Sequence, residues 1–80
     1  MEAKNSEIRL LDVRDLPAPE PLHKILHMAA SLAPGDRLVV HHSRVPCLLY
    51  ARLAERGLQV VTEQPSVDLV VLTIQRPLPE

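Results

Sequence analysis

Three prolines within five residues, at positions 17, 19 and 21, constrain this 80-residue chain more than any other stretch. Each proline holds its own φ at about −65° and steers the preceding residue toward extended backbone. Pro21 can still stand in the first turn of a helix, because the amides of that turn have no intrahelical carbonyl to bond. We therefore expect residues 16–22 to form a rigid elbow that links a strand to the start of a helix.

An elbow of this kind usually presents a side chain that uses the positive end of the helix dipole. The residue in that place is Ala18, whose methyl group carries no chemistry. The elbow therefore predicts that residue 18 is exposed at a helix start, but it does not indicate any reaction.

The remainder of the chain alternates between strand-like and helix-like periodicity. Leu22, Ile25, Leu26, Ala29 and Leu32 recur at steps of three and four, which predicts a helix over residues 19–32. A second helix is expected over residues 46–56, with a packing face drawn from Leu48 or Leu49, the Arg52 stem, Leu53, Ala51 and Ala54. Alternating or continuous apolar runs predict strands over residues 8–13, 37–41, 58–63 and 67–74.

This order predicts an α+β fold, a two-layer α/β sandwich with the connectivity β-α-β-α-β-β. Right-handed crossovers place both helices on one face of the sheet. A proline turn at residues 64–66 makes the last two strands a hairpin, and the last strand, apolar on both sides, should be central. The sheet is therefore expected to be mixed, with strand order 1-2-4-3. Residues 1–80 form one domain, with flexible ends at 1–6 and 76–80.

Composition excludes several classes of function. The formal net charge is −1, and the chain has no Phe, no Trp and one Tyr, so it has neither a basic stripe for phosphates nor an aromatic platform for bases. We expect no nucleic-acid binding. No apolar run reaches transmembrane length and the first residues carry no apolar signal region, so we expect no membrane association. The single Cys fits a reducing compartment, and a cytoplasmic location is the expectation.

Three segments together resemble a known family. They are a Leu-Asp-Val-Arg-x-Leu strand end at residues 11–16, an x-Pro-Glu-Pro helix start with Pro19, Glu20 and Pro21, and Pro-Gly-Asp-x-Leu-x-Val from residue 34. In this setting residues 10–74 resemble the TusA/SirA-like sulfur-carrier family. Members of that family carry a Cys directly before the first proline of the motif. This Cys accepts persulfide sulfur and passes it to a partner protein.

The matching position here is Ala18, so the resemblance implies the fold and a protein partner but not the sulfur chemistry. Residues 41–46 and 48–57 are similar to a branch of this fold without the Cys, whose members stand alone or are appended to hemerythrin-like proteins. No activity follows from that branch.

Cys47 is the one thiol that could replace the missing group. It follows Pro46 at the start of the second helix, where the helix dipole and Arg44 would favour the thiolate. Both helices should begin at the same edge of the sheet, so Cys47 is expected on the same rim as Ala18. The alternative is a small apolar residue under a helix start, which free Cys often is.

Histidines offer a second candidate chemistry, a transition-metal site. His23 lies near the first helix start, and His41 and His42 end the second strand, so with Cys47 they could supply three or four ligands. Neighbouring strand residues point to opposite faces, so only one of His41 and His42 can join each side. The alternative is solvent-facing histidines, because no paired metal-binding signature is present. Beyond this metal, no cofactor is predicted.

The sheet face away from the helices is the last candidate site. Leu10, Val39, Val61 and one row of the last strand should face outward and form an apolar patch. Such a patch could dock a partner or a second copy in a homodimer. The function predicted first is therefore a non-catalytic, sulfur-carrier-like protein-interaction module. The alternative is a small redox or metal-binding accessory protein that uses Cys47 and nearby histidines. An enzyme is the least favoured reading.

Overall fold

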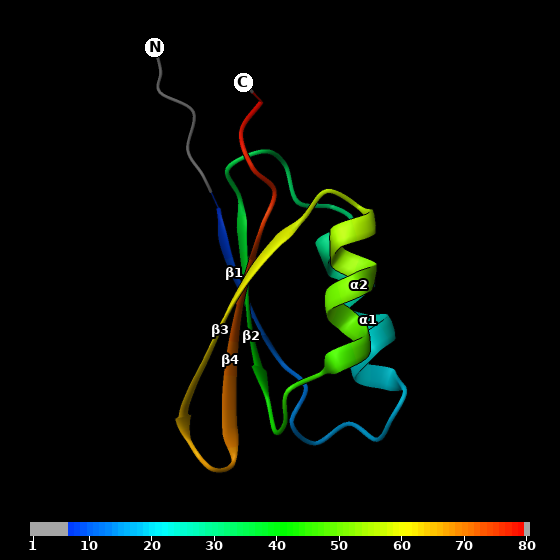
Figure 1. Ribbon diagram of the computed structural model, residues 1–80, viewed down its shortest axis with the longest axis vertical. Coiled ribbons are helices and arrows are strands. Elements are labelled where there is room, and N and C mark those ends of the chain that lie inside the picture. Colours follow the sequence, from blue (N-terminus) through cyan, green and yellow to red (C-terminus); the bar gives the residue numbers. More distant parts are fainter. Residues whose placement is uncertain (1–6, 80) are drawn as a thin grey trace.

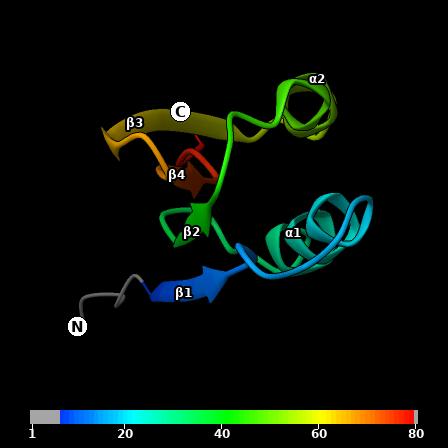
Figure 2. The same cartoon turned by 90° about the horizontal axis from the view of Figure 1, so that it is seen from below.

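One four-stranded sheet carries both helices on the same face, which leaves its other face open (Figure 1, Figure 2). The structure is a computed structural model that describes residues 7–79. The predicted flexible lead, residues 1–6, and Glu80 lie outside the described residues. The elements in chain order are β1 (Ile8–Asp12), α1 (Glu20–Ala29), β2 (Arg37–His42), α2 (Cys47–Glu55), β3 (Gln59–Ser66) and β4 (Leu69–Gln75).

The sheet has the predicted order, β1-β2-β4-β3. β1 pairs parallel to β2, and β4 lies antiparallel to both β2 and β3. β4 is central, as its nearly continuous apolar run predicted. The predicted fold class is confirmed.

The core lies between the sheet and the helices. On the α1 side Ile25, Ala29 and Leu32 are buried, with Leu22 and Leu26 packed against them, as the helical spacing predicted. Alternate residues of the two central strands complete the core; these are Leu38, Val40, Val70, Leu72 and Ile74. Aliphatic side chains therefore make up most of the covered face of the sheet.

The packing face of α2 differs in part from the prediction. Leu49 and Leu53 are fully buried, whereas Leu48 is 74% exposed, which settles the alternative that the sequence left open. The other residues expected to pack are exposed, namely Ala51, Arg52 and Ala54. Tyr50 packs against the core instead, and its hydroxyl shares a 2.6 Å hydrogen bond with Thr62 Oγ1 on β3. The reason is that α2 rests beside β3, so the side turned to that strand is covered.

The end of α1 and the last hairpin differ most from the predicted boundaries. α1 ends at Ala29, because the amides of Ser31 and Leu32 bond the carbonyls three residues back and tighten the last turn. The hairpin turn lies at residues 67–68 rather than at 64–66, and β3 runs through Pro65. β3 is an edge strand with a register shift between Glu63 and Ser66, which is where a strand tolerates proline.

Hydrogen bonds of Asp36 and Arg76 hold the loops at the edge of the sheet opposite to the helix starts. The buried Asp36 carboxylate accepts the Glu7 amide at 3.0 Å and the Ala33 amide at 3.1 Å. Arg76 Nε donates to the Leu32 carbonyl at 2.6 Å, and its own carbonyl accepts the Gly35 amide at 2.8 Å. The first residue of the predicted flexible tail is thus anchored, because it continues the line of β4 toward this loop. Among residues 7–79 no helix has the length and apolarity needed to cross a bilayer.

Candidate functional site

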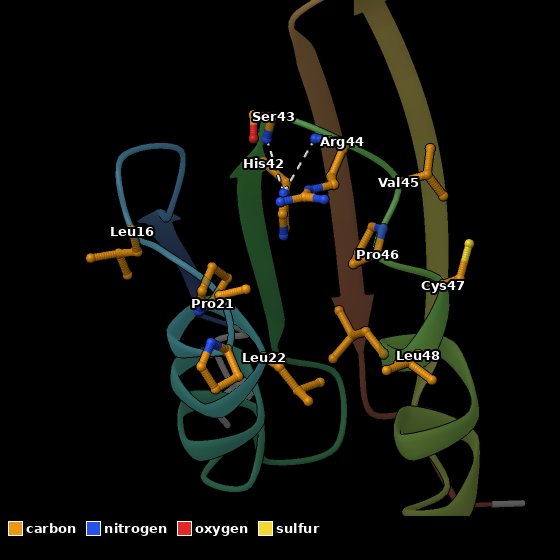
Figure 3. A pocket seen from close by; sticks show the side chains of 13 residues that line it. Leu16, Pro21, Leu22, His42, Ser43, Arg44, Val45, Pro46, Cys47 and Leu48 are labelled. Atoms are coloured by element: carbon orange, nitrogen blue, oxygen red, sulfur yellow. Dashed lines mark hydrogen bonds between the residues drawn. The ribbon is translucent and has the colours of Figure 1, made fainter.

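A pocket of about 320 Å³ opens between the starts of the two helices (Figure 3). It forms there because β1 and β2 are parallel, so both chain segments leave the sheet at the same edge before entering a helix. Ala18 and Cys47, which were expected on one rim, both line it. The other lining residues are Leu16, Pro19, Pro21, Leu22, His42, Ser43, Arg44, Val45, Pro46, Leu48 and Leu49.

The proline elbow builds one wall of the pocket. The Glu20 amide donates to the Pro17 carbonyl at 2.9 Å, and the Ala18–Pro19 peptide bond is cis. Pro19 is the N-cap of α1 and supplies no side-chain acceptor, and Pro21 is buried in the first turn. Glu20 is exposed beside them, where its carboxylate suits the helix dipole. The motif prolines therefore shape the pocket rather than act in it.

His42 ends β2 on the buried side of the sheet and is only 6% exposed. Its Nδ1 accepts the Ser43 amide at 2.9 Å and the Arg44 amide at 3.3 Å (Figure 3). Burial, with a smaller contribution from the Arg44 charge, lowers the pKa of His42 below its ordinary value. The ring is therefore neutral at pH 7, and because Nδ1 accepts, the ring proton is on Nε2.

The predicted metal ligands are not brought together. His41 faces the open side of the sheet, opposite to His42, as strand alternation requires. His23 is exposed on α1 and is not among the pocket residues. The described residues contain no group of three or more His, Cys, Asp or Glu side chains that could hold a metal ion.

The Cys47 thiol is exposed at the first residue of α2. Figure 3 shows its sulfur directed away from His42 and from the proline wall. Pro46 is the N-cap of α2 and not the first helical residue, so the helix starts one residue later than expected. The thiol thus lies at the mouth of the pocket and does not point toward the histidine.

Asp12 and Arg14 hold the chain where it enters the elbow. Arg14 donates from Nη2 to Asp12 Oδ2 at 2.8 Å and from its own amide to Oδ1 at 3.0 Å. The Arg14 hydrogen bonds, from the side chain first and then from the backbone, lower the pKa of Asp12 to about 2. The amide of Leu16 then bonds the Val13 carbonyl at 3.1 Å, which turns the chain toward the prolines.

Sequence reasoning missed the part that His42 plays. It treated the ring as a metal ligand, whereas the ring binds two backbone amides and closes the inner wall of the pocket. A signal was present: Leu38, Val40 and His42 alternate along one strand, so the row that buries two aliphatic residues also buries the histidine.

The pocket lining combines apolar side chains with a few polar groups. Its lining contains no Asp or Glu, and most of its surface comes from Leu, Pro and Val side chains. The polar groups that it offers are the His42 ring, the Ser43 hydroxyl, the Arg44 guanidinium and the Cys47 thiol at the mouth. An apolar pocket with a few polar groups near one end is the usual form of a ligand site.

Comparison with known proteins gives a family but no function. A protein-family model matches residues 10–76, a span that runs from β1 to just past β4 and includes the whole pocket. No curated protein and no solved structure matches this chain. The chain therefore belongs to the family described as "Uncharacterized conserved protein (DUF2249)".

Proposed function

We propose that this protein is a non-catalytic interaction module with a sulfur-carrier-like fold, and that it docks a partner protein over the pocket between the starts of α1 and α2. One observation carries this proposal. The pocket lies at the elbow where the resembling family presents its Cys, yet Ala18 stands there and the lining is largely apolar. In this proposal the pocket serves to dock a partner, and no group is transferred because Ala18 stands where the resemblance implies a Cys.

The surface around the pocket supports a partner larger than a small molecule. Leu48 is 74% exposed and Val45 is 42% exposed, and both adjoin the pocket at its mouth. Exposed aliphatic side chains that continue a pocket outward are typical of protein contact surfaces. Cys47 and the histidines take no catalytic role in this proposal, because the thiol points away from His42.

Position-specific photo-crosslinking tests the proposal. A photoreactive residue placed at position 48 should capture a discrete partner in cells, whereas the same residue at position 54 should not. Ala54 is the matched control because it is exposed on the same helix and does not line the pocket. Adding Leu22→Glu should abolish capture from position 48. Equal labelling at positions 48 and 54 would contradict the proposal.

The open sheet face supports a second binding proposal, a homodimer. The strand registers place Leu10, Val39, Thr73 and Val61 in one row across all four strands. Leu10 is 74% exposed and Val61 is 62% exposed, so the row ends in accessible aliphatic side chains on both edge strands. A second copy of the same face would cover this row, and the oligomeric state in solution tests it.

A further inference from the structure

We propose that the pocket between the helix starts binds the C-terminal residue of the partner protein, with its free carboxylate near His42 Nε2 and the first amides of α2, and an apolar side chain among the prolines and leucines. This inference rests on the proposed docking function and adds the chemistry of the docked segment.

The start of α2 is uncapped. Its N-cap is Pro46, which has no side-chain acceptor, and its first turn has no acidic residue. Within residues 7–79 the Cys47 and Leu48 amides have no acceptor, while the Leu49 amide bonds the Pro46 carbonyl at 2.9 Å. Free amides at the positive end of a helix favour an anion.

The start of α1 differs, and this directs the anion toward α2. Glu20 already places a carboxylate in the first turn of α1, and its amide is bonded to Pro17. Pro21 has no N–H to offer. Of the two helix N-termini at the pocket, only that of α2 therefore has no carboxylate in its first turn.

His42 is a second and independent indication of a ligand. The side chain is more than nine-tenths buried, and its Nδ1 is taken by two backbone amides. Nε2, which carries the ring proton, has no acceptor among the described residues. Every fully buried side-chain nitrogen among the described residues has a hydrogen-bond partner. Because Nε2 has none, it is not fully buried and can be reached by a ligand. Figure 3 shows this end of the ring directed into the space between Leu22 and Pro46.

The charges of the pocket agree with an anionic ligand. Arg44 is exposed beside the His42 ring, and no salt bridge is present for it within the described chain. The lining holds no carboxylate that would repel one. A carboxylate at this point would accept from an imidazole N–H and from backbone amides, with the guanidinium nearby.

The apolar lining and the mouth explain why the carboxylate should belong to a protein chain. A volume of about 320 Å³ is at the lower end of ligand pockets and suits one aliphatic residue. The exposed Leu48 and Val45 then lie where the preceding residues of an incoming chain would pass. A free short-chain acid would leave both side chains uncovered.

Peptide titrations of the full chain test this inference by NMR. The probes are Gly-Ser-Gly-Ser-Leu with a free C-terminus, the same peptide amidated, and isovaleric acid. We expect the free-acid peptide to shift the amide signals of Cys47 and Leu48 and to bind about tenfold more tightly than the amidated form, since hydrogen bonds to a charged group are lost.

Variants locate the site. His42→Asn keeps an acceptor for the 43–44 amides but removes the Nε2 donor, and should erase the preference for the free acid. His27→Asn, an exposed histidine outside the pocket, should leave that preference unchanged. Arg44 is exposed, so the fold should tolerate Arg44→Gln. This variant should bind the free-acid peptide several-fold more weakly. Arg44→Gln therefore still tests the carboxylate site if His42→Asn does not fold.

Equal binding of the two peptides, binding of neither, or isovaleric acid binding as tightly as the free-acid peptide would each overturn the inference. The proposed function fails separately, when crosslinking from position 48 captures no more than crosslinking from position 54. If position 48 captures a partner but the peptides show no preference for a free carboxylate, the docking proposal stands. The inference that the pocket binds a C-terminal residue is then wrong.

Discussion

The backbone amide of Ser43 donates to His42 Nδ1 at 2.9 Å, and the next amide, that of Arg44, approaches the same nitrogen at 3.3 Å. One side chain at the end of β2 therefore holds the turn that leads into α2. The ring can accept these bonds only while it is neutral, because protonated histidine has no lone pair left. Protonation of the ring should therefore lower the stability of the fold.

Stability should fall in mild acid because of His42. The folded pKa lies below the ordinary value of 6.5, so between the two the unfolded chain binds more protons. The contribution is complete above pH 6.5 and is lost as the pH falls from there through the folded pKa. Urea unfolding at pH 7.5 and 5.5 should show a smaller loss for His42→Asn than for the native chain or for His27→Asn. Equal losses in all three would contradict this role.

A second acid transition should come from Asp12. Arg14 lowers the folded pKa of this carboxyl from 3.8 to about 2, so its contribution is present above pH 3.8 and is lost as the pH falls toward 2. The pair is exposed, so the effect should be small and should shrink in high salt. NMR titration of the Asp12 carboxyl carbon measures the pKa directly. In Arg14→Gln it should return toward its ordinary value, and an unchanged midpoint would show that Arg14 is not the cause.

Leu49 and Leu48 should respond oppositely to truncation. Leu49→Ala removes a fully buried side chain and should lower the free energy of unfolding by about 2–5 kcal/mol. Leu48→Ala alters a side chain that is 74% exposed and should change it by less than about 0.5 kcal/mol. Denaturant melts of the two variants compare them on the same helix. Similar losses would mean that α2 is rotated about its axis.

A thiol introduced at position 18 tests whether the elbow presents a side chain to solvent. In a Cys47→Ser background, Ala18→Cys should yield a fold of native stability, because Ala18 is exposed at the pocket. The new thiol should be alkylated by iodoacetamide in the folded protein at least as fast as in a denatured control, since the start of α1 favours thiolate. A thiol protected from reagent until unfolding would show that the elbow hides this position.

A charge on the open sheet face should prevent self-association if that face joins two copies. Val61→Lys places an ammonium at a position that is 62% exposed, so the fold itself should tolerate it. Sedimentation equilibrium should then show a native dimer and a monomeric variant. Lys substitution at Ala54, exposed on the helical side, is the control and should not change the mass. A native monomer at high concentration would contradict the dimer.

Periodicity predicted most of the fold. Steps of three and four identified the buried face of α1, and an apolar run predicted the central place of β4 in the sheet. Gly57, at φ +73°, marks the end of α2, where a left-handed residue is needed. These features are local or follow from general rules of chain connection, so one sequence suffices to predict them.

Errors arose where a neighbouring element decided the outcome. The turn of the last hairpin moved because an edge strand with a register shift can contain Pro65. The position of β3 determined which side of α2 is buried. Tyr50 faces β3 and shares a hydrogen bond with Thr62, whereas Ala51 and Ala54 are exposed. Local periodicity does not carry this information, since it depends on which strand lies beneath the helix.

For the site, the sequence alone determined that a proline elbow would begin a helix without a reactive residue at Ala18, and that Cys47 would lie on the same rim. That the rim encloses a pocket, that the thiol points away from His42, and that His42 closes the inner wall became clear from the tertiary structure alone. The physical reason is that dihedral limits and side-chain period act along the chain, whereas a cavity and the direction of a side chain within it depend on the packing of segments far apart in sequence.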